Sequence, residues 1–257
     1  NQRYGDWPLK VEDKKVEDIW KEPEWMLLSY NKNVSASSEV KPAKNVVDEN
    51  VQTWWKAKTD KNEWIKIDLG KSVTVNAIQI NFEDDHGNVK IPDGVERFTD
   101  FPNHCRYIED REFKTRWILE GSNDDKEWFV IEDKSKVDTD LPHDLVLIEQ
   151  GLKIRYVKLT VVELPYNQSA CVCGLRVFGL DENGEKPKKV ENVVAKRKDT
   201  MTMDVEWQST NQVGFEVLWG LQPDKLYHNF RVFGKTKQEI GALMEGQHYY
   251  VRVDAFN

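Results

Sequence analysis

Trp64-Ile65-Lys66-Ile67-Asp68-Leu69 is the stretch that decides the fold class. From Ile65 onward, apolar and polar side chains alternate with a period of two, which indicates a strand with one face buried and one exposed. The same alternation recurs in three further runs, Val75–Ile80, Trp117–Glu120 and Arg155–Val161. Each run predicts a half-buried strand.

Turn residues bound these runs: Gly70-Lys71-Ser72 follows the first and Ser122–Asp125 the third, and Gly179 follows a further run, Leu175–Phe178. Short alternating strands joined by turns are typical of an antiparallel β-sandwich, so the sequence predicts an all-β fold. Between Asn81 and Lys114 the alternation lapses into a loop-like stretch. Long loops inside compact domains usually carry function or are disordered, which makes this stretch a candidate for binding residues.

The chain has 257 residues, more than a single domain usually contains, so we expect two domains. The composition turns polar around Gly184 and Pro187, and alternation resumes in Met203–Trp207, Phe215–Trp219 and Tyr249–Ala255. We therefore predict an N-terminal linker or packing segment (1–30), a first sandwich (31–180), a linker (181–186) and a second, smaller sandwich (187–257).

Composition and charge argue against two classes of partner. The net charge of -8, with Lys and Arg interspersed among Asp and Glu, disfavours a nucleic-acid surface, which needs clustered cations. No apolar run approaches the roughly 18 residues of a membrane helix, so no membrane insertion is expected. Asn1 opens the chain without the features of a signal peptide, which suggests a processed or partial chain.

The three cysteines, Cys105, Cys171 and Cys173, form an odd set, and two of them are separated by a single residue. This spacing places both on one face of a strand, which disfavours a disulfide framework. No His or Cys lies at a ligand spacing from them. We interpret them as small apolar residues of the core.

Ordered motifs in the first sandwich resemble the coagulation factor V/VIII type C, or discoidin, family. They are Asn33–Ser38, Val47–Trp55 and Trp64–Gly70, followed by Leu119–Trp128, Arg155–Leu159 and Gly174–Gly179. The resemblance covers about residues 31 to 180 and implies a discoidin-type jelly-roll β-sandwich. Residues 187–257 resemble an immunoglobulin-like fibronectin type III domain, with Trp207 in the core and Tyr249 in a tyrosine corner.

The order of these two domains, introduced by Trp25–Asn31, is similar to the C-terminal region of some bacterial family-43 glycoside hydrolases. This resemblance implies an upstream catalytic domain in the same chain, acting on glycans that contain arabinose and xylose. It also implies a secreted, periplasmic or cell-surface location. A fibronectin fold needs one strand more than the sequence up to Asn257 provides, so we expect the second sandwich to lack its last strand.

The resemblance also implies a structural calcium site in the first sandwich. Its ligands would be the carbonyls of Asn45, Asn50, Thr53 and Cys173 together with the side chains of Asp48 and Thr53. Calcium prefers six to eight oxygen ligands, and this loop is rich in them. Gly174 stands where many family members have a ligating Glu, which weakens the expected site. The alternative is a turn in which Asp48 bonds its own backbone.

Ligand-binding residues are best sought on the loops at one end of the sandwich, because loops vary while the scaffold holds them. We expect most tryptophans (Trp55, Trp64, Trp117, Trp128, Trp207 and Trp219) to fill the core instead, as large aromatics on strands usually do. The loop candidates share an aromatic or hydrogen-bonding side chain. They are Trp54, His86, Arg97, Phe98, Tyr107, Tyr166 and Asn167.

Two functional interpretations remain open. In the first, the chain is a non-catalytic region that binds a polysaccharide or oligosaccharide, with Trp54 or Tyr166 stacking on a sugar ring. In the second, both sandwiches are structural spacers or packing modules for the catalytic domain. A catalytic role for Asp84-Asp85 or Glu109-Asp110 is disfavoured, since adjacent acids on a strand point to opposite faces. These acids are better explained as charged loop residues exposed to solvent.

Overall fold

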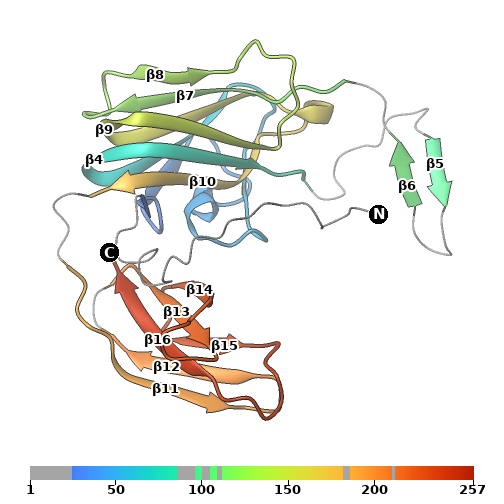
Figure 1. Ribbon diagram of the computed structural model, residues 1–257. Helices are drawn as coiled ribbons and strands as arrows, with labels where there is room; N and C mark the ends of the chain where they lie inside the picture. The colour runs from blue at the N-terminus through green and yellow to red at the C-terminus, as the bar shows by residue number, and fades with distance from the viewer. Residues whose placement is uncertain (1–24, 86–95, 100–104, 109–111, 182–185, 210–211) are drawn as a thin grey trace, which may run out of the picture. The chain divides into compact units, whose positions relative to one another are not determined.

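A computed structural model describes residues 25–85, 96–99, 105–108, 112–181, 186–209 and 212–257. The chain forms two compact units, Trp25–Glu182 and a second that contains Asn183–Asn257 (Figure 1). Helical structure in the described residues is limited to two short 3-10 segments, η2 (Ala43–Val47) and η3 (Pro165–Asn167). The all-β prediction is therefore confirmed.

The first unit is built on two long strands, β4 (Glu63–Phe82) and β9 (His143–Glu163), which pair with each other along most of their length. The order of neighbouring strands is β1-β10-β4-β9-β7-β8, with β2 also paired to β4 and β3 to β10. The sheet already includes residues before Asn31, because β1 pairs with β10. The remaining strands of this sheet are β1 (Met26–Leu27), β2 (Asn33–Ala36), β3 (Trp55–Lys56), β7 (Arg116–Ser122), β8 (Phe129–Asp133) and β10 (Cys171–Leu180).

β4 bends in the middle and contributes to both layers of the sandwich. Its first half pairs with β2 and its second half with β10, and its register against β9 shifts between Asp68 and Val73. The sequence predicts two strands separated by a turn at Gly70, whereas the chain stays in the sheet throughout. Gly70 has a φ of 87° and its backbone N–H donates a 2.8 Å hydrogen bond to Asp68 Oδ1. This local geometry allows the strand to turn the corner without ending.

Side chains from both halves of β4 meet in one core. Ile65 and Ile67 lie in the same buried cluster as Ile78 and Ile80, and all four are fully buried. Trp55 and Trp117 are also fully buried, as predicted. The β-sandwich prediction for the first unit is confirmed.

The core prediction is wrong for Trp64 and Trp128, which are half-buried. Trp64 lies on the strand face opposite the core residue Ile65, because alternate residues of a strand point to opposite faces. Trp128 packs beside Tyr156, with ring centroids 6.4 Å apart, and Lys158 Nζ lies 4.4 Å from its ring centre. These aromatics belong to the outer face of the sheet.

The second unit has two three-stranded sheets around its own core. One sheet has the order β11-β12-β15 and the other β14-β13-β16. Trp207 is buried as predicted, whereas Trp219 is half-buried and stacks on His228. Among the described residues β16 pairs with β13 alone and is an edge strand. The strands are β11 (Glu191–Arg197), β12 (Met203–Gln208), β13 (Gly214–Gly220), β14 (His228–Phe233), β15 (Lys237–Ile240) and β16 (Tyr250–Phe256).

The predicted tyrosine corner is formed in this unit. The Tyr249 hydroxyl accepts a 3.1 Å hydrogen bond from the backbone N–H of Met244, five residues upstream. This contact fixes the chain just before β16. The assignment of the unit to the fibronectin type III family stays a prediction.

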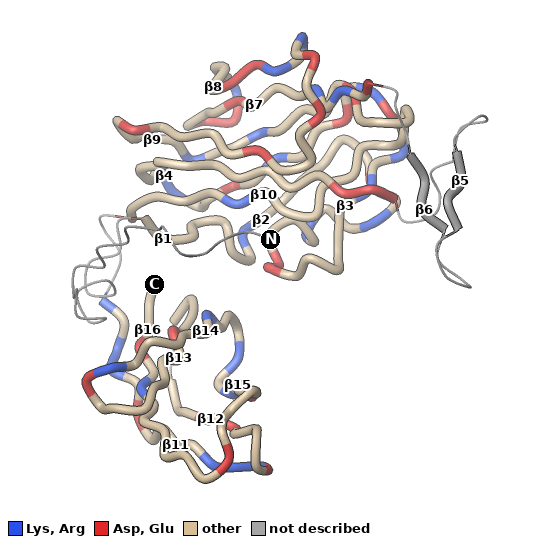
Figure 2. Tube along the Cα trace, turned by 45° about the vertical axis from the view of Figure 1, so that its right-hand side comes forward, with Lys and Arg blue, Asp and Glu red and all other residues tan. Residues whose placement is uncertain are grey.

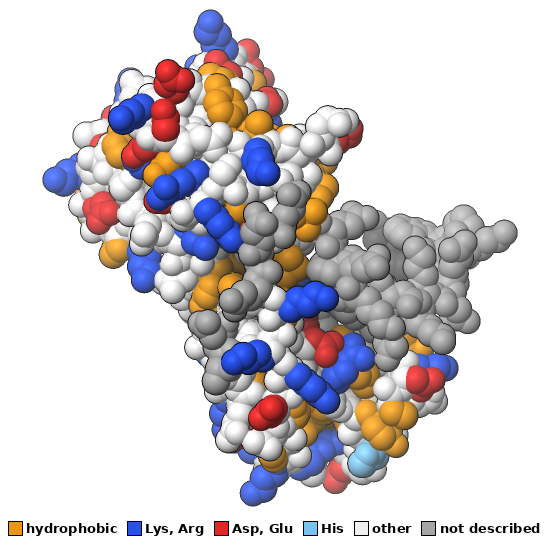
Figure 3. Space-filling model, turned by 90° about the vertical axis from the view of Figure 1, so that its left-hand side faces the viewer, with side chains coloured by type: hydrophobic (Ala, Val, Ile, Leu, Met, Phe, Trp, Pro, Cys, Tyr) orange, Lys and Arg blue, Asp and Glu red, His pale blue; other side chains and the backbone are white. Residues whose placement is uncertain are grey.

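Charged residues of both signs are interspersed along the strands of each unit (Figure 2). Lys, Arg, Asp and Glu side chains also alternate over the face visible in Figure 3. Many of them form ion pairs, such as Arg155 with Asp68 and Arg176 with Glu49. In the described parts of the chain, no helix has the length and apolar character needed to cross a membrane.

Candidate functional site

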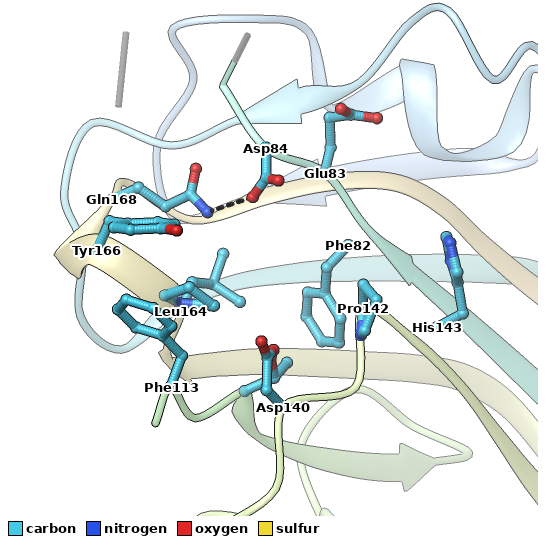
Figure 4. A pocket seen from close by; sticks show the side chains of 12 residues that line it. Phe82, Glu83, Asp84, Phe113, Asp140, Pro142, His143, Leu164, Tyr166 and Gln168 are labelled. Carbon is cyan, nitrogen blue, oxygen red and sulfur yellow. Dashed lines mark hydrogen bonds between the residues drawn. The ribbon is translucent and has the colours of Figure 1, made fainter. Parts of the chain in front are cut away.

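A cavity of 370 Å³ opens at one end of the first unit, where β4 ends, β7 begins and β9 both begins and ends (Figure 4). Four separate segments of the chain therefore build its walls. Aromatic, apolar and acidic side chains share the lining. The lining residues are Phe82, Glu83, Asp84, Phe113, Thr115, Asp140, Pro142, His143, Leu164, Pro165, Tyr166 and Gln168.

Tyr166 supplies an exposed aromatic ring to this cavity. It lies in η3, directly after β9, and its side chain is 37% exposed. Its ring packs against Phe113 with centroids 4.4 Å apart and the planes inclined by 44°. Tyr166 has a φ of 63° and Asn167 a φ of 50°, values that non-glycine residues rarely adopt. The local backbone is thus held in an uncommon conformation that presents the Tyr166 ring at the cavity.

Gln168 ties this loop to the end of β4. Its side-chain oxygen accepts a 3.1 Å hydrogen bond from the backbone N–H of Asp85, and its side-chain nitrogen donates a 3.0 Å bond to Asp84 Oδ1 (Figure 4). Both contacts span more than eighty residues of sequence, so they fix two distant loops relative to each other. Gln168 is 9% exposed, and its amide is a structural element of the cavity wall.

Asp84 and Asp85 have different environments, and the interpretation as solvated loop charge is wrong for Asp85 alone. Asp84 is exposed and lines the cavity, whereas Asp85 is 4% exposed and pairs with Lys56. The two carboxylates point in different directions, as expected for adjacent residues in an extended chain. Asp85 is therefore a buried structural group, and Asp84 belongs to the candidate site.

The opposite wall carries Asp140. Its Oδ1 accepts a 2.7 Å hydrogen bond from the Thr115 hydroxyl, which positions the carboxylate. Figure 4 shows Asp84 and Asp140 on opposite sides of the cavity, with Leu164 between them and the Glu83 side chain turned away. The arrangement combines two acidic hydrogen-bond acceptors with an aromatic surface. Such a combination can hold a molecule that has hydrogen-bond donors on its edge and an apolar face.

The structure brings one of the predicted binding residues, Tyr166, into this cavity. Asn167 is exposed next to it but does not line the cavity. Trp54 is half-buried, and Lys41 Nζ lies 3.0 Å from the centre of its ring, so a sugar cannot stack on the face that Lys41 covers.

The other predicted binding residues fall partly or wholly outside the described part of the chain. His86 lies outside the described residues altogether. Arg97 and Phe98 are in β5 (Glu96–Thr99) and Tyr107 is in β6 (Cys105–Ile108). Arg97 and Tyr107 face each other across this antiparallel strand pair. The structure does not describe the side chains of Arg97, Phe98 and Tyr107. Their roles stay predictions.

Sequence reasoning missed Phe113, Asp140 and Gln168, and it treated Asp84 as ordinary loop charge. Phe113 and Asp140 precede β7 and β9, and Gln168 follows β9. Their convergence depends on the pairing of β4, β7 and β9. Phe113 and Gln168 lie a few residues from the predicted strands Trp117–Glu120 and Arg155–Val161, where loops at one end of a sandwich can meet. Asp140 is far from the end of any predicted strand.

The loop with the predicted calcium ligands forms its own hydrogen-bond network. Asp48 Oδ1 accepts a 2.9 Å bond from the backbone N–H of Asn50, and Asp48 Oδ2 accepts a 2.6 Å bond from the Thr53 hydroxyl. The first contact is the Asx turn of the alternative interpretation. A carboxylate oxygen in such a turn still has a lone pair for a cation, so both interpretations fit this geometry.

Asn45, a further predicted calcium ligand, lies in η2 just before this turn. The Asn45 side chain donates a 3.0 Å bond to Trp54 O, which leaves its own carbonyl for other contacts. Within the described residues no group of three or more His, Cys, Asp or Glu side chains is arranged to hold a metal ion. The predicted set depends mainly on carbonyl oxygens, and the calcium site stays a prediction.

Two of the cysteines are described, and both are free thiols. Burial raises the pKa of Cys171 to about 12 and that of Cys173 to about 11. Cys171 is buried, as predicted, and Cys173 is half-buried. Cys105 is in β6, where side chains are outside the description.

Comparison with known proteins agrees with the architecture of the first unit. Residues 45–101 match the F5/8 type C family model described as a NedA-like, galactose-binding domain. The likeness to this family lies in residues 45–101. The matched residues include the Asp48 loop, the whole of β4 and Asp84, so they contribute one wall of the candidate site. No curated protein matches the chain.

Solved structures similar to this chain include several carbohydrate-binding modules. Chitosan-binding module 1 from a Paenibacillus sp. IK-5 chitosanase/glucanase is 18% identical, with a TM-score of 0.44 over 60% of this chain and 99% of the module. The family 32 module of Clostridium perfringens NanJ, in complex with galactose, is also 18% identical, with a TM-score of 0.44 over 60% and 98% of the two chains.

Proposed function

We propose that this chain is a non-catalytic glycan-binding region whose binding site is the cavity at the end of the first unit. The observation that carries the proposal is the exposed Tyr166 ring beside the acceptors Asp84 and Asp140. An aromatic face packs against the C–H face of a sugar ring, while carboxylates accept hydrogen bonds from its hydroxyls. The match to a galactose-binding domain model supports the same class of ligand.

We further propose that the chain serves an attached glycosidase that degrades arabinose- and xylose-containing glycans outside the cell. A binding region tethered to a catalytic domain raises the local concentration of that domain on its polymer. The sequence resemblance to family-43 enzymes supports this part of the proposal. The two rigid sandwiches are compatible with such an accessory role.

Affinity electrophoresis of this chain tests the proposal. Gels containing arabinoxylan, arabinan, galactan or a chitin-derived soluble polymer are compared with a gel without polysaccharide. Retardation on at least one polymer, reduced by Tyr166→Ala, is the expected result. Uniform mobility on every gel would instead favour the spacer function, in which both units pack against a neighbouring domain and touch no glycan.

A further inference from the structure

The two acidic side chains of the cavity are held by neutral partners. Asp84 accepts a hydrogen bond from the Gln168 amide, and Asp140 accepts one from the Thr115 hydroxyl. Both carboxylates are exposed, and Figure 4 shows them on opposite sides of the cavity. Neutral donors orient a carboxylate without cancelling its charge. The cavity therefore has two oriented negative charges.

Several basic residues that adjoin the lining, or pair with a residue next to it, bind acids other than Asp84 and Asp140. Lys56 pairs with Asp85, while Lys114 and Arg116 both pair with Asp138. Similarly, Lys134 pairs with Asp144 at a distance of 2.5 Å. Among the described residues, no Lys or Arg forms an ion pair with Asp84 or Asp140, and none lines the cavity. Among the described lining residues, His143 is the one with a basic side chain. Within the described part of the chain, neither carboxylate has its charge balanced by a Lys or Arg.

The rest of the lining indicates what kind of cation fits. A bare metal ion prefers six or more oxygen ligands in a polar shell. This cavity instead has Phe82, Phe113 and Leu164 between its carboxylates, together with the Tyr166 ring. Apolar walls favour an organic cation that can pack a hydrocarbon face against an aromatic ring. An amino sugar has both parts, a ring with a C–H face and an ammonium group on its edge.

We propose that this cavity prefers glycans with free amino groups, of the glucosamine type, over their N-acetylated or carboxylated counterparts. The inference rests on the proposed glycan-binding function and names the ligand class of the same site. The ammonium group donates to Asp84 or Asp140 while the sugar ring packs on Tyr166. An N-acetyl group removes the charge, and a uronic acid adds a negative charge that both carboxylates repel.

Titration calorimetry with soluble oligomers tests this preference. The glucosamine tetramer is compared with its fully N-acetylated counterpart and with a galacturonic acid tetramer. We expect the glucosamine tetramer to bind about fivefold more tightly than the acetylated one, since each exposed charge contact contributes modestly. The difference should shrink as salt is added, because salt screens exposed charges.

Two variants and a sugar-free cation make the test specific. The double variant Asp84→Asn and Asp140→Asn should bind the glucosamine tetramer and its acetylated counterpart with equal affinity. Its affinity for the acetylated tetramer should equal that of the unchanged chain. Glu127→Gln removes an exposed acid beyond the other end of β7 and should leave the preference intact. Tetralysine should bind far more weakly than the glucosamine tetramer, which rules out attraction to the net negative charge alone.

The outcomes separate the two proposals. Equal binding of the amino and acetylated tetramers by the unchanged chain would overturn the amino-sugar inference and leave glycan binding standing. A preference that survives the double variant would overturn it as well, because the charge would then be recognised elsewhere. Absence of binding to every oligomer and every polysaccharide would overturn the proposed function itself.

Discussion

The side-chain amide of Gln168 lies between the backbone N–H of Asp85 and the carboxylate of Asp84, and it bonds both at 3.1 and 3.0 Å. One buried side chain thereby joins the loop after β9 to the loop after β4. Replacement by leucine keeps the volume but removes both bonds. We predict that Gln168→Leu lowers the free energy of unfolding of the first unit by about 1–3 kcal/mol, because the Asp85 N–H loses its partner.

Urea unfolding measures this effect. Gln150→Leu is the matched control, since Gln150 is exposed on β9 and should change stability by less than about 0.5 kcal/mol. An unchanged midpoint for Gln168→Leu would show that the two loops hold their positions without this amide.

Tyr166 provides a second prediction. Removal of its ring in Tyr166→Ala should weaken glycan binding about five- to tenfold, which corresponds to the ~1 kcal/mol of an aromatic contact. Tyr166→Phe should bind nearly as well, because the ring remains. Tyr227→Ala removes a ring that is 66% exposed in the second unit and should not affect binding. Equal affinities for Tyr166→Ala and the unchanged chain would exclude Tyr166 from the site.

The ion pair of Asp68 and Arg155 predicts a pH-dependent stability. Hydrogen bonds from the Arg155 guanidinium are the main cause that holds the pKa of Asp68 below its usual range. A carboxylate with a lowered folded-state pKa contributes stability above the unfolded pKa of about 3.9 and loses it as pH falls through the folded value. The destabilisation caused by Arg155→Gln should therefore be greatest near neutral pH and shrink under acidic conditions.

Thermal unfolding over a pH series measures this difference. Arg197→Gln is the comparison, because the Arg197 guanidinium donates to the carbonyls of Thr200, Met244 and Gln247 and, in the described parts of the chain, to no acid. The destabilisation caused by Arg197→Gln should therefore not change as pH falls and carboxylates become protonated. A pH-independent cost for Arg155→Gln would contradict the lowered pKa of Asp68.

The predicted calcium site has a test that separates it from the Asx turn. Calcium added to a chelator-treated sample should raise the melting temperature of the first unit, and magnesium should raise it less. Asp48→Asn keeps an oxygen for the turn but removes the charge. We expect this variant to be nearly as stable without metal and to respond less to calcium. No calcium response in the unchanged chain would leave the turn as the sole role of Asp48.

Local sequence patterns were sufficient to predict the strands, because alternation of polarity is a property of neighbouring residues. The alternation around Ile65 and Ile78 predicted two buried strand segments, and both lie in β4. The same reasoning failed for Trp64 and Trp128. Large aromatic side chains are usually buried, yet these two lie on the outer face of the sheet. Strand register, and not side-chain size, decides which face a residue occupies.

The site was harder to predict than the fold. Tyr166 was proposed from its place in a loop after a strand, and the structure places it at the cavity. Asp140 and Phe113 gave no signal of their own, because their role depends on which strand ends lie side by side. That information resides in the long-range pairing of β4, β7 and β9, which one sequence does not reveal.

Because β4 bends, the width of the cavity depends on the register between β4 and β9. Phe82 is the last residue of β4 and Asp84 lies just beyond it. His143 begins β9, and Leu164 directly follows its last residue. A slip of one residue between these strands would shift the walls by about 3.3 Å and turn the core side chains of β4 outward. Core packing therefore also determines the geometry of the binding site. The strand register that buries Ile65 and Ile78 is the same register that sets the spacing of the side chains lining the cavity.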